Sequence, residues 1–165
     1  MSQRNVETVL EVYRAFRERD RQSVVAVYDS DVEWNMEGYP GWLGKESYRG
    51  VDGVEEFFRD WLHDFDGYEA DALDVLDQGD RVIVTVHDRA RGKGSGVPIE
   101  RHHAQVWSFN EEGRATRIEV FESRDAALAA HPPRTRAPLR ERAAADRLRL
   151  TVGGQLRLLP RDSRR

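Results

Sequence analysis

Histidine is the side chain in this sequence best suited to proton transfer, because the pKa of an unperturbed imidazole lies near neutrality. Two of the five histidines, His102 and His103, are adjacent in a segment rich in Val, Trp and Phe, which predicts a strand. Adjacent residues of a strand point to opposite faces, so only one of the two can reach a shared site. One of this pair is therefore the candidate proton-transferring group, and a structural or interface histidine is the alternative.

Metal, thiol and nucleotide chemistry have little support. The sequence has no cysteine, which removes disulfides, thiolate nucleophiles and cysteine-ligated zinc or iron–sulfur sites. Its histidines show neither an i, i+4 pair nor a His-x-His on one strand, so we expect no metal and no cofactor. The glycine-rich segment 92–96 lacks the ending of a phosphate loop and is typical of a hairpin tip.

Aromatic side chains are the second group that could form a site. In a hollow fold they would line a cavity for an apolar ring-bearing ligand, although core packing explains most of them equally well. The residues concerned are Trp34, Tyr39, Trp42, Phe57, Trp61 and Trp107.

The spacing of apolar residues predicts the elements that must position these side chains. One apolar face repeats at helical spacing over residues 2–19, and Asp20 is placed to cap a second, shorter helix. Asp52 and Glu55 form a capping signal before a third helix, and Ser123 is placed to cap a last one through Ala130. Strands are predicted over residues 31–36, 68–77, 81–91, 98–109 and 114–122.

Short turns join the last four predicted strands, so the sheet they form should be antiparallel. Three helices packed on one face of a curved antiparallel sheet give an α+β roll. The curvature leaves a cone-shaped hollow between the helices and the concave face.

Charge divides the 165 residues into two parts. Residues 1–130 hold 27 acids against 16 bases, a net charge of −11, whereas residues 131–165 hold 3 acids against 10 arginines, a net charge of +7. We expect one domain over 1–130 and a basic Pro- and Arg-rich tail over 131–165 that is disordered or loosely docked. The acidic body argues against a nucleic-acid-binding core, and only the tail could contact an anionic partner.

The sequence gives no sign of a membrane partner. No apolar run approaches the roughly 20 residues of a membrane span, and the first residues lack the apolar segment of a signal peptide. We therefore expect a cytoplasmic protein.

Several segments together resemble the SnoaL-like, ketosteroid-isomerase-like branch of the nuclear-transport-factor-2-like superfamily. They are the two N-terminal helices, DVEW, PGWLG, YRGVDGVEEFFRDW, DRVIVTVHDRARGKGSG and HHAQVWSFNEEGRATRIEVFESRDAALAA. The resemblance covers residues 1–130 and not the tail. It implies a cystatin-like α+β roll with a conical pocket for a small, mostly apolar ligand, in a homodimer packed through the sheet.

The resemblance also implies site residues. Tyr13 matches the oxyanion-binding tyrosine of the isomerases, whereas Trp34 stands where they have the general-base aspartate. Gln105 falls near the position of the isomerases' second oxyanion donor. In the polyketide cyclases, a partnering histidine corresponds to Gln105 and the acid/base aspartate corresponds to Val120. If Gln105 lines the hollow, His103 and Trp107 on the same strand face do so too. His103 is then the candidate proton carrier.

We therefore expect a small-molecule-binding protein whose enzymatic activity, if any, is acid/base chemistry of the isomerase, cyclase or hydrolase type on a ring-bearing compound. The catalytic candidates are Tyr13 and His103, and the substrate-binding candidates are Trp34, Phe57, Trp61, Gln105, Trp107 and Val120. The alternative is a non-catalytic ligand-binding or dimerisation module of the same fold.

Overall fold

The computed structural model describes residues 2–133, so the predicted tail lies almost wholly outside the described residues. The elements are α1 (Ser2–Arg17), α2 (Arg21–Ala26), β1 (Tyr28–Asn35), β2 (Ser47–Arg49), α3 (Gly50–Leu62), β3 (Phe65–Asp77), β4 (Arg81–Gly92), β5 (Pro98–Phe109), β6 (Ala115–Phe121) and α4 (Arg124–Ala130). None of these helices is long and apolar enough to cross a bilayer.

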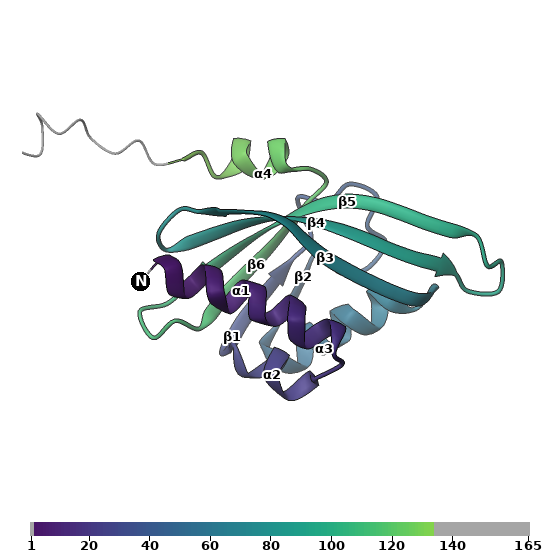
Figure 1. Ribbon diagram of the computed structural model, residues 1–165, viewed down its shortest axis with the longest axis horizontal. Coiled ribbons are helices and arrows are strands. Elements are labelled where there is room, and N and C mark those ends of the chain that lie inside the picture. The colour runs from purple at the N-terminus through teal and green to yellow at the C-terminus, as the bar shows by residue number, and fades with distance from the viewer. Residues whose placement is uncertain (1, 134–165) are drawn as a thin grey trace, which may run out of the picture. The chain divides into compact units, whose positions relative to one another are not determined.

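The strands form one curved six-stranded sheet in the order β2-β1-β6-β5-β4-β3 (Figure 1). The β3–β4, β4–β5 and β5–β6 pairs are antiparallel, as their short connections predicted. One pair differs from the expectation, because β1 runs parallel to β6. The chain enters β1 from a helix rather than from a hairpin turn, so nothing forces that pair to be antiparallel.

Helices α1, α2 and α3 lie on one face of the sheet and α4 lies on the other (Figure 1). The alternation of side chains along the strands divides the core accordingly. On β4, Val82, Val84 and Val86 belong to the large cluster beneath the first three helices, whereas Ile83 belongs to a smaller cluster with Ala127 of α4. The result is the predicted α+β architecture, with the larger core between the helices and the sheet.

The predicted N-cap residues were right for two helices and wrong for a third. The side chains of Asp20 and Ser123 accept hydrogen bonds from backbone N–H groups at the starts of α2 and α4, as predicted. Helix α3 begins at Gly50, before the predicted cap, so Asp52 lies inside its first turn. There its carboxylate faces the positive end of the helix dipole.

Candidate functional site

The two adjacent histidines separate onto the two faces of β5. His103 is 2% exposed and faces the helices. His102 faces the other way and stacks on His87 at a ring distance of 4.5 Å. Gln105 and Trp107 follow His103 on the inner face, and both are buried. The structure therefore brings together on one strand face three residues that the sequence singled out.

A hydrogen-bond network with a fixed direction joins these side chains to α1. Trp107 Nε1 donates to Gln105 Oε1 at 3.0 Å, and the Tyr13 hydroxyl donates to the same oxygen at 2.8 Å. An indole N–H can only donate, so Gln105 presents its carbonyl to Trp107 and its amide nitrogen to His103 Nε2, 3.2 Å away. Nε2 must then accept, which leaves the proton of a neutral His103 on Nδ1.

Asp88 lies at the other end of this network, and the sequence analysis did not select it. Its Oδ2 lies 3.1 Å from His103 Nδ1 and 3.3 Å from Arg101 Nε, and its Oδ1 accepts from the Tyr68 hydroxyl at 2.7 Å. The contact with His103 is bent away from ideal hydrogen-bond geometry. The carboxylate is 2% exposed. Asp88 follows Val82, Val84 and Val86 at the same strand parity, which is the signal that could have placed it inside.

Two groups of this network, Asp88 and Tyr13, have shifted pKa values. Burial raises the pKa of Asp88, but the contacts of its carboxylate with His103, Tyr68 and Arg101 outweigh it and hold that pKa below its usual value. Burial raises the pKa of Tyr13 well above its usual value, and nearby Tyr68 and Asp88 add to the rise. Asp88 is therefore ionised and Tyr13 remains a neutral donor.

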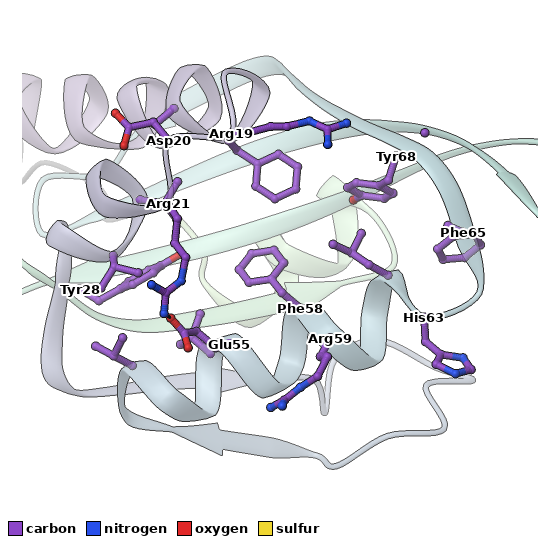
Figure 2. A pocket seen from close by; sticks show the side chains of 18 residues that line it. Arg19, Asp20, Arg21, Tyr28, Glu55, Phe58, Arg59, His63, Phe65 and Tyr68 are labelled. Carbon is purple, nitrogen blue, oxygen red and sulfur yellow. Dashed lines mark hydrogen bonds and ion pairs between the residues drawn. The ribbon is translucent and has the colours of Figure 1, made fainter. Parts of the chain in front are cut away.

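Two cavities lie next to each other beneath the helices. The inner one has a volume of about 30 Å³, room for about one water molecule, and Tyr13, Trp34, Gln105 and Trp107 are among its walls. The outer one has a volume of about 840 Å³ and lies between the α1–α2 turn, α3 and the start of β3 (Figure 2). Only the outer cavity is large enough for a ring-bearing ligand.

Aromatic rings form the boundary between the two cavities. Phe16, Tyr28, Phe58 and Tyr68 line both of them. The ring of Phe16 lies 5.7 Å from that of Phe58 and 6.0 Å, edge to face, from that of Tyr68. Tyr68 is tied to Asp88 through its hydroxyl, whereas the two phenylalanines have no polar anchor. Access from the outer to the inner cavity therefore depends on the rotamers of Phe16 and Phe58.

Two buried polar groups on the walls of the inner cavity have no hydrogen-bond partner among residues 2–133. They are the Tyr28 hydroxyl and Trp34 Nε1, on residues that are 3% and 2% exposed and both line the inner cavity. An unpaired buried donor costs about 1–3 kcal/mol, so this cavity is suited to a water molecule or to an acceptor oxygen of a ligand.

Three of the candidate substrate-binding residues line neither cavity. Phe57 stacks on Trp34 at 4.5 Å, and Trp61 packs between His103 and the guanidinium of Arg101. Val120 lies opposite Gln105 in the β5–β6 register. All three are buried and support the walls from behind. His103 likewise lines neither cavity, because Gln105 stands between its Nε2 and the space beyond.

The mouth of the outer cavity carries charged side chains. Arg21 on α2 forms an ion pair with Glu55 on α3 across the opening (Figure 2). Asp20 caps α2 by accepting from Ser23, which lowers its pKa. Within residues 2–133 no group of three or more His, Asp or Glu side chains is arranged to hold a metal ion.

The helix-covered curved sheet is the architecture of the nuclear-transport-factor-2-like, ketosteroid-isomerase-like proteins. The chain matches the SnoaL-like domain family over residues 9–118, and it belongs to that family. This is a family of ligand-binding and isomerase- or cyclase-type proteins. No curated protein matches the chain.

Solved structures agree with this assignment. The chain is similar to TerC co-crystallised with polyporic acid, with 26% identity, 79% of this chain and 97% of that chain covered, and a TM-score of 0.64. An NTF2-like protein of unknown function from Burkholderia pseudomallei is also 26% identical, over 76% of this chain and 95% of that one, with a TM-score of 0.63. A Mycobacterium tuberculosis protein in complex with estradiol-17β-hemisuccinate shares the fold at 15% identity, over 74% and 96% of the two chains, with a TM-score of 0.61.

Proposed function

We propose that this protein binds a small, apolar, ring-bearing compound in the outer cavity. The observation that carries the proposal is the cavity itself, about 840 Å³ in volume, with Phe16, Phe58, Phe65 and Tyr68 among its walls. Burial of a ring against such walls supplies binding free energy of about 25 cal/mol for each Å² of apolar surface removed from water.

The unpaired donors in the inner cavity give the ligand an orientation. An oxygen substituent that reaches inward between Phe16 and Phe58 would meet the donors of Tyr28 and Trp34, which have no partner among the described residues. The ligands named for two similar structures, polyporic acid and estradiol-17β-hemisuccinate, are ring compounds that carry oxygen substituents. They support a ring-bearing ligand with an acceptor oxygen.

Native mass spectrometry of the full chain with a panel of ring compounds tests the proposal. The panel contains estradiol, estradiol-17β-hemisuccinate, polyporic acid and the methyl ester of 1-pyrenebutyrate. We expect at least one compound to bind with a stoichiometry of one per chain. The same spectra report the oligomeric state, for which a homodimer remains our prediction.

Phe58→Ala should weaken binding of the retained compound by about tenfold or more, because the ring of Phe58 is a wall of the cavity. Phe121→Ala is the matched control, since Phe121 packs in the smaller core with Ala127. Titration of both folded variants with the same compound decides the matter. Equal affinities for the two variants would place the ligand elsewhere and contradict the proposal.

Acid/base catalysis is the second candidate, and the Asp88–His103 pair favours it. A carboxylate beside Nδ1 orients an imidazole and stabilises its protonated form. If a ligand oxygen displaced the Gln105 side chain, the Tyr13 hydroxyl and His103 Nε2 would lose their partner together. Nε2 could then take a proton from the carbon beside a ring carbonyl, and the C–H electron pair would form an enolate whose oxygen accepts from Tyr13.

His103→Asn should then slow proton abstraction by about 100-fold or more and leave ligand affinity unchanged. The measurement is hydrogen–deuterium exchange beside the carbonyl of α-tetralone in D₂O, followed by NMR with the wild type and the variant. Exchange by the wild type no faster than in buffer, or unaltered in the variant, contradicts the catalytic candidate and leaves the binding proposal standing.

A further inference from the structure

The outer cavity has a basic mouth in an otherwise acidic part of the chain. Three arginines, Arg19, Arg21 and Arg59, line it together with the acids Asp20 and Glu55. Residues 1–130 as a whole carry 27 acids against 16 bases. The excess of positive charge at the opening is therefore local and opposite in sign to the surroundings.

Both acids at the mouth are already engaged, whereas two of the arginines are not. Glu55 pairs with Arg21, and Asp20 accepts from the backbone and side chain of Ser23. The guanidinium groups of Arg19 and Arg59 form no ion pair or hydrogen bond with any other residue that the structure describes. Both line the cavity, Arg19 from the α1–α2 turn and Arg59 from α3, with the aromatic rings between them (Figure 2).

Arg19 occupies a backbone position that ordinarily selects glycine. The N–H of Asp20 donates to the carbonyl of Ala15 at 2.8 Å and the N–H of Arg19 donates to that of Phe16 at 3.1 Å, which together form a Schellman motif at the end of α1. Arg19 has φ +58° and is the only non-glycine residue with positive φ among those described. A side chain at this position strains the backbone, and glycine would remove the strain. The arginine is therefore retained at a cost to local stability.

From these observations we infer that the ligand carries an anionic oxygen substituent, such as a carboxylate, which the unpaired charges of Arg19 and Arg59 attract at the mouth while its ring lies in the cavity. This inference rests on the proposed function and adds the charge of the ligand to it. The fork of donors on a guanidinium matches a carboxylate, and neither Arg19 nor Arg59 would have to give up a described partner to bind one. The paired Arg21 and Glu55 would mark the neighbouring edge of the opening.

Two probes that share the pyrene ring and chain, one with a charged carboxylate and one with a neutral ester, test the inference, namely 1-pyrenebutyrate and its methyl ester. Fluorescence titration of the full chain should show the acid binding about tenfold more tightly than the ester, with the difference shrinking as salt is raised. Equal affinities would overturn the inference and leave the proposed function intact. Failure of both probes to bind would overturn the inference, and it would overturn the proposed function as well if no compound of the panel binds.

Two variants assign the preference to the arginines. Arg19→Gly should bind the acid several-fold more weakly and the ester as the wild type does, with a melting temperature equal to or above that of the wild type. Arg59→Gln should lose selectivity in the same way, and the double variant should bind acid and ester alike. Arg4→Gln is the control, because Arg4 is an exposed arginine near the other end of α1. A preference for the acid that survives the double variant would overturn the inference.

Discussion

Asp88→Asn should lower the free energy of unfolding by about 3 kcal/mol at pH 7. Tyr68 and Arg101 donate hydrogen bonds to this carboxylate, and the Nδ1–H of His103 lies 3.1 Å from it. An asparagine amide offers one acceptor oxygen and turns its NH₂ group toward at least one of these donors. His103 cannot relieve the clash by moving its proton to Nε2, because the Gln105 amide already donates there.

Urea denaturation of the wild type and the variant measures this effect, with Asp71→Asn as the matched control. Asp71 pairs with Arg89 on the partly exposed β3–β4 surface, so its loss should cost less than about 1 kcal/mol. Similar values for the two variants would contradict a buried, charge-bearing network at Asp88.

The effect of Asp88 should also depend on pH. Its folded pKa lies below the ordinary value of 3.8, so its contribution to stability is present above that pH and is lost as the pH falls through the folded pKa. The difference in unfolding free energy between the wild type and Asp88→Asn should therefore shrink below about pH 4. A difference that stayed constant down to pH 2 would mean that the carboxylate is not preferentially ionised in the fold.

Gln105→Leu should cost about 2–3 kcal/mol although leucine nearly preserves the shape of the side chain. The substitution removes the acceptor for Tyr13 and Trp107 and the donor to His103, so three buried polar groups lose a partner at once. Chemical denaturation at pH 7 measures the loss. A cost below about 0.5 kcal/mol would show that these groups find other partners and that the network has no fixed direction.

Gln105→Glu tests the direction of the hydrogen bonds in the network, that is, which nitrogen of His103 accepts. A carboxylate can still accept from Tyr13 and Trp107, but its second oxygen would face His103 Nε2 and favour an imidazolium held between two carboxylates. Nitrogen-15 NMR of the His103 ring should show the neutral Nδ1–H tautomer in the wild type and the doubly protonated ring in the variant. An Nε2–H tautomer in the wild type would contradict the assigned direction.

Periodicity was sufficient to predict the elements because each strand or helix buries one regular face. The strand predicted over 98–109 is β5 to the residue, and its parity placed His103 and Gln105 on one face. The short strand β2 escaped prediction because Ser47–Arg49 lies within a glycine- and proline-containing loop. It pairs with β1 through three residues, too few to show an alternating pattern.

The pattern of polar residues along β4 did not predict that Asp88 is buried. Beside Arg89 and Arg91 it has the appearance of one charge in an exposed salt-bridged strand, yet Arg89 pairs with Glu69 and Asp71 on the outside. Asp88 is buried because Tyr68, Arg101 and His103 satisfy it, and those partners come from positions 13 to 20 residues away. Which residues contact Asp88 depends on the register between strands, and the sequence pattern does not determine that register.

The division of the hollow into two cavities could not be predicted from the sequence either. Helical spacing placed Phe16 and Phe58 on buried faces, but whether their rings fill the cone or leave it open depends on side-chain packing between α1, α3 and β3. The rings of the candidate residues Phe57 and Trp61 point into the core behind the walls for the same reason. Residue type and face were predictable, whereas the position of the free space was not.

A crystal structure of the full chain with the methyl ester of 1-pyrenebutyrate would show the ligand site directly. The ring is expected in the outer cavity, in contact with Phe16, Phe58 and Tyr68. The neutral ester removes any attraction to the arginines, so its position reports on the aromatic walls alone. A pyrene ring bound on the α4 side of the sheet, or an outer cavity left empty at a saturating concentration of the ester, would contradict the proposed site.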